Sequence, residues 1–428
     1  MLVEFSFGNF RSFKEEAIFS MEPASQNGEN YNTINTNLKR VPQLFYTSGI
    51  FGANASGKSN VINAFRFFIF LVKNSSKASI EDDLPEEFYA LSKESEKQPV
   101  YFGIKFVVDQ LLYDYRFSFI KKAIVSERLT YCDISANGSN KSNRVFDRKY
   151  IEGKSIFQKS AGILQSWCNE VIDTRLFLSD LVNNRKCKKK EILDVYNWIL
   201  EKLVVLDAHQ MNEGFSLDKI AKGEGKEIIN WMKKADLGLE DITVRQIPLD
   251  EVLKKLQEQK KKPSAKLIER ISKGKAKVFD TKSYHRTEDG ELKAFDFDEI
   301  ESDGTKNFLA MIGPFLDILN QGNVVIVDEM DDSLHPYLVK YFVEMFNDPE
   351  LNVKKAQLIF TSHAHYLMDG RHLTRDQIWL TTKEVNGGYS SSLYSLSDLK
   401  GRSDRKNISF QEAYLEGVYG AVPNLESL

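Results

Sequence analysis

One segment has the residue types and the spacing of a loop that binds phosphate. Residues 52–59 read GANASGKS and match the pattern G-x-x-x-x-G-K-[ST]. In such a loop the backbone N–H groups surround the phosphates, the lysine reaches the β- and γ-phosphate oxygens, and the hydroxyl after it binds Mg²⁺. We therefore expect Lys58 to act in catalysis and Ser59 to bind the metal. The residues expected to contact ATP are Asn54, Ala55, Ser56, Gly57, Lys58 and Ser59.

Two acids follow a short apolar run much later in the chain. Val324–Val327 is uninterrupted by polar residues, and Asp328 and Glu329 come directly after it. An aspartate at a strand end can hold Mg²⁺ through water, and a glutamate beside it can orient and deprotonate the attacking water. Alone, the pattern also fits a strand that simply ends at two acids. Together with the phosphate loop it predicts a Walker B motif, with Asp328 on the metal and Glu329 as the catalytic base.

Two more positions belong to the predicted site. Ser302 and Gly304 stand just before an amphipathic helix, at an N-terminus where an anion is favoured. The alternative for Ser302 or its neighbour Asp303 is an ordinary helix cap. His363 follows a second apolar strand and would there sense the γ-phosphate. Its alternatives are a plain surface histidine or half of a metal site with His365.

Periodicity indicates the elements that must position these residues. Alternation of apolar and polar residues predicts strands at 2–13, 16–21, 100–108, 111–120 and 123–132. Helical spacing predicts a buried helix after Ser59 and a second one that ends near Gly322. The short apolar runs 49–51, 324–327 and 358–360 are typical of strands buried on both faces. Helices between such strands predict an α/β fold with a parallel sheet.

Composition excludes several classes of protein. The chain has 428 residues, of which 42% are apolar and 28% are charged, so it is neither disordered nor fibrous. With 58 basic and 61 acidic residues, the charge as a whole favours no partner. Three cysteines without a C-x-x-C pair argue against a disulfide framework or a zinc site. The longest apolar run, 61–72, is too short for a membrane span, and the first residues do not resemble a signal peptide, so we expect a cytoplasmic protein with no membrane contact.

Two stretches are locally basic. Residues 185–190 hold five Lys or Arg, and 251–277 holds ten against three Glu. Each is either a solvated helix face or a place where nucleic acid or a partner docks.

The order of the motifs resembles that of ABC-type ATPases of the RecF/SMC/OLD-like branch. The start at 9–13, NFRSF, and the form of the loop at 52–59 are similar to that branch. The segments ESDGT at 301–305, LHP at 334–336 and the tail at 413–423 resemble the bacterial RloA/abortive-infection group of predicted ATP-binding proteins. This resemblance covers about 70 N-terminal and about 140 C-terminal residues. It implies an ABC-type P-loop ATPase head with a β-rich lobe and a helical insertion.

The resemblance also implies an organisation and a role. The expected ATPase core is 1–80 and 281–428, the β-rich lobe is 81–160, and the helical, charged insertion is 161–280. Ser302 and Gly304 of one subunit would complete the ATP site of another in a homodimer or higher oligomer, and Arg11 would contact phosphate or adenosine unless it is an ordinary surface arginine. No motif for base specificity is visible, so GTP stays open beside ATP.

The implied function is that of a Mg²⁺-dependent ATPase in anti-phage defence. Only about 65 residues follow His363, fewer than the Toprim nuclease of some relatives needs, so we expect the effector, a nuclease or toxin, to be encoded separately. The chain would be its sensor, regulator or scaffold. The alternative is a RecF/SMC-like ATPase of DNA repair or maintenance, in which the basic stretches bind DNA. Salt-dependent DNA binding would favour this alternative.

Overall fold

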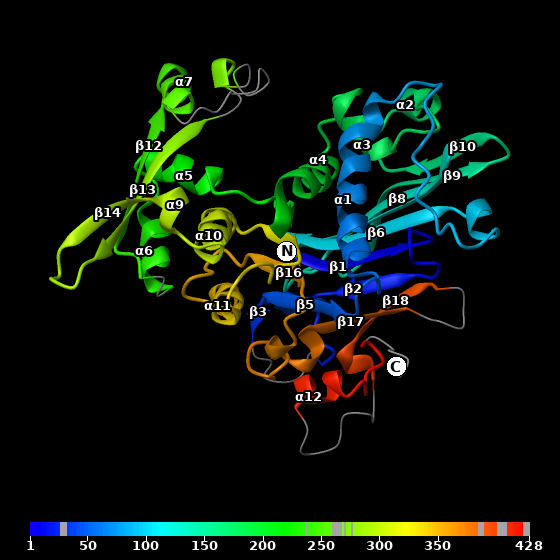
Figure 1. Ribbon diagram of the computed structural model, residues 1–428. Coiled ribbons are helices and arrows are strands. Elements are labelled where there is room, and N and C mark those ends of the chain that lie inside the picture. Colours follow the sequence, from blue (N-terminus) through cyan, green and yellow to red (C-terminus); the bar gives the residue numbers. More distant parts are fainter. Residues whose placement is uncertain are drawn as a thin grey trace. The chain divides into compact units, whose positions relative to one another are not determined.

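The chain folds into two units, each with its own strands and helices (Figure 1). The computed structural model describes residues 1–25, 32–235, 238–258, 268, 271–274, 277–383, 389–399 and 409–422. Unit 1 comprises Met1–Asp207, Leu319–Met330 and Lys340–Leu428, and unit 2 comprises Ala208–Ile318 and Asp331–Val339. None of the helices in the described ranges is long and apolar enough to cross a membrane.

An antiparallel sheet of seven strands forms one layer of unit 1, in the order β10-β9-β8-β7-β6-β1-β2. One of its faces is lined with aromatic side chains because the strands alternate. Phe5 stacks on Phe65 of helix α1 (Lys58–Asn74) with 3.8 Å between the ring centroids, and Phe117 stacks on Phe68. These rings fix the helix that follows the phosphate loop. The strands are β1 (Leu2–Gly8), β2 (Ala17–Ser20), β6 (Val100–Val108), β7 (Leu111–Ile120), β8 (Ala123–Asp133), β9 (Ser142–Ile151) and β10 (Lys154–Lys159).

A second sheet of unit 1 is mainly parallel and has the order β11-β15-β16-β5-β17-β18. Every pair is parallel except β17 with β18. Strands β5, β15 and β16 are buried along their whole length, as expected for parallel strands covered on both faces. The carboxyl ends of the parallel strands therefore meet at one edge. The strands are β5 (Thr47–Gly52), β11 (Leu203–Asp207), β15 (Val324–Asp328), β16 (Gln357–Thr361), β17 (Ile378–Lys383) and β18 (Ser391–Ser395).

Smaller elements complete this unit. Strands β3 (Thr33–Asn35) and β4 (Gln43–Phe45) form a two-stranded sheet. The further helices are α2 (Gln165–Glu170), α3 (Phe177–Asn183), α4 (Lys190–Asn197) and α12 (Phe410–Leu415). Helix α12 belongs to the tail whose sequence carries part of the family resemblance, and Pro423 of that tail lies outside the described residues.

Unit 2 has a three-stranded antiparallel sheet in the order β12-β13-β14. Its strands are β12 (Asp241–Ile247), β13 (Val278–Arg286) and β14 (Leu292–Asp296). Its helices are α5 (Gly214–Ala221), α6 (Lys226–Lys234), α7 (Leu249–Glu258) and α9 (Phe297–Ile300), and the helices α10 (Asp303–Gln321) and α11 (Pro336–Asn347) begin in it. Within this unit, Ser216 of α5 donates a hydrogen bond to the backbone oxygen of Leu309 in α10 at 2.5 Å, at a place where α10 carries Gly313.

The predicted α/β class is confirmed, and so are most of the predicted strands. The hairpin of β6 and β7 has the predicted bounds, and its turn is made by Asp109, whose φ of 54° lies in the left-handed region. The region 161–280 differs from the expectation because it contains strands as well as helices. Its strand β12 alternates polar and apolar residues only over 241–245, a signal too short to stand out in a region whose charged segments are mainly helical.

Candidate functional site

The predicted phosphate loop connects β5 to α1. Strand β5 ends at Gly52, and α1 begins at Lys58. Gly57 has a φ of 119°, a backbone conformation that side chains disfavour. A Cβ atom added to Gly57 would lie 2.6 Å from the hydroxyl oxygen of Ser391, and one added to Gly52 would lie 2.4 Å from the backbone oxygen of Thr381. The glycines are therefore required by the close approach of neighbouring strands.

Hydroxyl groups of neighbouring segments contact the phosphate loop and the first turn of α1. Ser56 is buried and its Oγ lies 2.6 Å from Oγ1 of Thr381 in β17. On the other side, the hydroxyl of Ser12 lies 2.8 Å both from the side-chain amide of Asn60 and from the hydroxyl of Ser391. Sequence patterns give no role to Thr381 or Ser391, and they include Ser12 only as part of the NFRSF motif. Only the order of the strands brings them to the loop.

The tip of the loop is open to solvent while its lysine is buried. Asn54 and Ala55 are exposed, and Ala55 has a φ of 60°. Lys58 is only 6% exposed, and its Nζ donates hydrogen bonds to the backbone oxygens of Gly52 at 2.8 Å and Ala53 at 3.1 Å. The ammonium group thus lies across the loop that is expected to surround phosphate. Ser59 is the next residue, in the first turn of α1, and is half-buried.

The predicted Walker B acids lie at the carboxyl end of β15. Asp328 is the last residue of this strand and is buried. Glu329 follows it with a φ of 53°, a left-handed conformation that is uncommon for a residue other than glycine. Strand β16 lies between β15 and β5, so the acids are two strands from the phosphate loop, roughly 10 Å in a sheet. The acids and the loop therefore share one edge.

His363 lies two residues beyond the end of β16 and is exposed. The backbone just before it is anchored to the phosphate-loop strand, because Ser362 donates its N–H to the oxygen of Ile50 at 3.2 Å. The nearby His365 lies 3.3 Å through its Nδ1 from the amide nitrogen of Gln411 in α12. The predicted switch histidine thus stands at the same edge as the loop and the acids.

Arg11 is placed near the loop by its neighbour Ser12, but its side chain engages an acid. Its Nε donates to a carboxylate oxygen of Glu87 at 2.7 Å, and its guanidinium lies over the ring of Phe10. The side chain is 38% exposed. A role of Arg11 toward phosphate or adenosine stays a prediction, and it would require the exchange of this ion pair.

Ser302 and Gly304 belong to unit 2. The hydroxyl of Ser302 accepts the N–H of Thr305 at 3.1 Å, so Ser302 caps α10, as the alternative interpretation held. Its side chain is still exposed. The preceding Glu301 is buried, and its carboxylate lies 2.7 Å from Nε2 of His285 in β13, which fixes the chain just before the cap. A cap and a role in an ATP site are compatible, so the second role stays a prediction.

The site fits a nucleotide and Mg²⁺ by its chemistry. The loop is open to solvent at Asn54 and Ala55, and Lys58 supplies a positive charge. Ser59 and Asp328 offer the hard oxygen donors that Mg²⁺ prefers. These residues would hold the nucleotide and the metal, and the metal when bound would neutralise charge on the phosphates.

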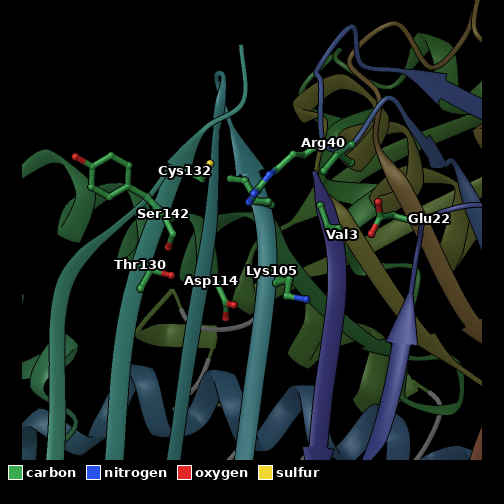
Figure 2. A pocket seen from close by; sticks show the side chains of 11 residues that line it. Val3, Glu22, Arg40, Lys105, Asp114, Thr130, Cys132 and Ser142 are labelled. Atoms are coloured by element: carbon green, nitrogen blue, oxygen red, sulfur yellow. The ribbon is translucent and has the colours of Figure 1, made fainter. Parts of the chain in front are cut away.

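A separate pocket of about 290 Å³ lies on the seven-stranded sheet (Figure 2). Its charged lining is already engaged with neighbours in part. Lys105 forms an ion pair with Glu4 at 2.9 Å, and Asp114 forms one with Arg116 at 2.7 Å. None of the predicted nucleotide-site residues lines this pocket.

Comparison with known proteins adds a family. No curated protein matches the sequence significantly. Among solved structures, the SMC head domain from Thermotoga maritima is similar at 12% sequence identity, with 92% of this chain and 98% of that chain covered and a TM-score of 0.40. The family described as "AAA domain, putative AbiEii toxin, Type IV TA system" matches residues 48–157 and 177–369.

The matched ranges contain the phosphate loop, the two acids at the carboxyl end of β15, and His363. The match confirms the predicted relation to ABC-type P-loop ATPases of the abortive-infection group. Since it extends over most of the chain, the protein belongs to this family of AAA domains.

Proposed function

We propose that this protein binds and hydrolyses ATP with Mg²⁺, forms a dimer through composite ATP sites, and controls a separately encoded nuclease or toxin in anti-phage defence. The observation that carries the ATPase part is the shared edge of the parallel sheet. There the phosphate loop after β5, Asp328 and Glu329 at the carboxyl end of β15, and His363 after β16 lie at the ends of three adjacent strands. Family membership supports the same activity.

In this proposal each residue has a defined task. Lys58 binds the β- and γ-phosphate oxygens, and the backbone of the loop orients them. Ser59 and Asp328 hold Mg²⁺. Glu329 takes a proton from the attacking water, and His363 contacts the γ-phosphate. Ser302 and Gly304 are proposed to reach the ATP of a second subunit.

The proposed effector has its support in the family description, which names a toxin and a type IV toxin–antitoxin system. An ATPase that assembles only with bound ATP is suited to hold or release such a partner, because the nucleotide then sets the population of the assembled state.

The alternative of a DNA-binding ATPase receives no support from the first basic stretch. Arg185 is paired with the carboxylates of Asp180 and Glu170, at 3.0 and 2.6 Å. Lys189 and Lys190 also face acids, Glu191 at 3.5 Å and Asp109 at 3.6 Å. Three of the five cations in 185–190 thus have intramolecular partners. The stretch 251–277 lies partly outside the described residues, and within the described part Lys277 pairs with Asp218.

The experiment that tests the proposed function is mass determination during size-exclusion chromatography. The Glu329→Gln protein is purified together with the products of its neighbouring genes and measured with and without Mg-ATP. We expect an ATP-dependent dimer or larger assembly that retains a neighbour. A protein that binds ATP and stays monomeric would contradict the composite site, and an assembly that retains DNA instead of a protein would favour the alternative.

Gly304→Ala should abolish this ATP-dependent assembly without harming the fold. A Cβ atom at Gly304 would lie no closer than 3.5 Å to any atom outside the immediate chain, and alanine is the better helix former by about 1 kcal/mol. If Gly304 meets ATP of a second subunit, the methyl group blocks that approach. We expect the variant to melt no lower than the parent protein and to run as a monomer with Mg-ATP in the Glu329→Gln background.

The control for this variant is Gly290→Ala, at a turn of the same unit where nothing lies within 4 Å of the added Cβ. It should assemble as the parent does, although its positive φ lowers stability slightly. If Gly304→Ala assembled at the same ATP concentration as the parent protein, Gly304 would not be part of a composite ATP site.

A further inference from the structure

One buried hydroxyl contacts both Walker B acids. Thr361 is the last residue of β16 and is fully buried. Its Oγ1 lies 2.6 Å from Oδ1 of Asp328 and 2.8 Å from the backbone nitrogen of Glu329. The carboxylate of Asp328 can only accept a hydrogen bond, and the backbone N–H of Glu329 can only donate one. The Thr361 hydroxyl therefore donates to Asp328 and accepts from the N–H of Glu329.

The backbone of Thr361 extends this contact to a third residue. Its carbonyl oxygen accepts the N–H of Met330 at 3.0 Å. Three consecutive residues of the Walker B turn are thus bound by one residue of the neighbouring strand. This explains how Glu329 keeps a φ of 53°, because a strained backbone conformation persists only when its surroundings over-determine it.

We propose that Thr361 is a positioning residue of the ATPase site, which orients Asp328 toward Mg²⁺ and Glu329 toward the attacking water. This inference rests on the proposed function. The hydroxyl uses Oδ1 of Asp328 and so fixes the plane of the carboxylate and the direction of Oδ2. Groups that orient the ligands of a metal typically change metal affinity or activity by about 10- to 100-fold when they are removed.

The matched control is Thr47, a buried threonine at the opposite end of the same sheet. Thr47 begins β5, and its hydroxyl also makes one bond of each kind. It donates to Oδ1 of Asn347 at 2.8 Å and accepts from Nε2 of Gln377 at 3.0 Å. Since β5 rises about 3.3 Å per residue, this hydroxyl lies some 15 Å from the catalytic edge. Thr47→Val therefore removes an equally buried hydroxyl away from the site.

The test compares wild type, Thr361→Val, Thr361→Ser and Thr47→Val in three measurements. These are the steady-state rate, the equilibrium affinity for a fluorescent ATP analogue with and without Mg²⁺, and the melting temperature. For Thr361→Val we expect kcat to fall by about 10-fold or more and the gain in nucleotide affinity on adding Mg²⁺ to shrink by a similar factor. Its affinity without Mg²⁺ should stay within about twofold of wild type, because no residue of the phosphate loop is changed.

The remaining variants separate orientation from stability. Thr361→Ser should restore the Mg²⁺-dependent affinity and the rate to within about threefold, since it returns the hydroxyl. Thr47→Val should melt lower than wild type yet keep both site properties. Wild-type Mg²⁺ dependence in folded Thr361→Val would overturn the inference and leave the ATPase proposal standing. Loss of that dependence in folded Thr361→Ser would also overturn it. A wild-type protein that neither binds nor hydrolyses Mg-ATP would refute the proposed function itself.

Discussion

Glu329→Gln should lower the rate of ATP hydrolysis by about 10²- to 10⁴-fold while ATP continues to bind. Glutamine has the size of glutamate and keeps the backbone bond from residue 329 to Oγ1 of Thr361, but its amide cannot accept the proton of the attacking water. The phosphate loop and Asp328 are unchanged. The measurement is the steady-state release of phosphate, with nucleotide affinity measured in parallel.

The control for this substitution is Glu350→Gln, which converts an exposed acid after α11 to the same amide. It should hydrolyse ATP as wild type does. If Glu329→Gln hydrolysed ATP at the wild-type rate, Glu329 would not be the catalytic base. The two acids would then be an ordinary strand end and not a Walker B motif. Retained binding with lost hydrolysis would also supply the trapped state that the assembly experiment requires.

Lys58→Ala should weaken ATP binding by about 10²-fold or more. A hydrogen bond to a charged group contributes about 1.5–3 kcal/mol, and the ammonium of Lys58 is expected to make at least two with the β- and γ-phosphates. In this structure the ammonium binds the carbonyl oxygens of Gly52 and Ala53, so it already lies within the loop. Isothermal calorimetry with ATP in the presence of Mg²⁺ measures the loss.

A loss of folding must be separated from a loss of affinity in this variant. Lys58→Ala removes one hydrogen bond each from the carbonyl oxygens of buried Gly52 and half-buried Ala53, so we expect a lower melting temperature but a protein that is still folded at the assay temperature. Lys73→Ala, in the last turn of the same helix and exposed, controls for the removal of one lysine from α1. ATP affinity of Lys58→Ala within threefold of wild type would contradict the phosphate-loop interpretation.

Features that depend on a short stretch of the chain could be predicted from the sequence. The hairpin of β6 and β7 was predicted with its bounds because alternation and a turn at Asp109 lie within one stretch of chain. The strands β15 and β16 were recognised for the same reason, since each is a continuous apolar run. The residues predicted for the phosphate loop and the acids also stand in contiguous motifs, and the structure brings those motifs to one edge.

The supporting hydroxyls were beyond such reasoning. Thr361 acts on Asp328 across 33 positions of the chain, and Thr381 acts on Ser56 across 325. Which threonine faces which motif follows from the strand order, in which β16 stands between β15 and β5. A threonine at the end of an apolar run has no signature of its own. Similarly, the alternation in β12 is short, and its partner β13 begins about 30 residues later, so their pairing could not be predicted.

The left-handed backbone at Glu329 lowers thermal stability at the residue that ATP hydrolysis is proposed to require. A residue with a Cβ atom loses about 1 kcal/mol there, and asparagine tolerates this conformation better than glutamate does. Glu329→Asn should therefore raise the melting temperature by about 2 °C, as differential scanning calorimetry would show, although it shortens the side chain and abolishes hydrolysis. A lower melting temperature would mean that the carboxylate itself stabilises the fold. Selection for thermal stability alone would favour the replacement of Glu329 by a residue that tolerates positive φ. Retention of glutamate at this position would therefore indicate selection for ATP hydrolysis.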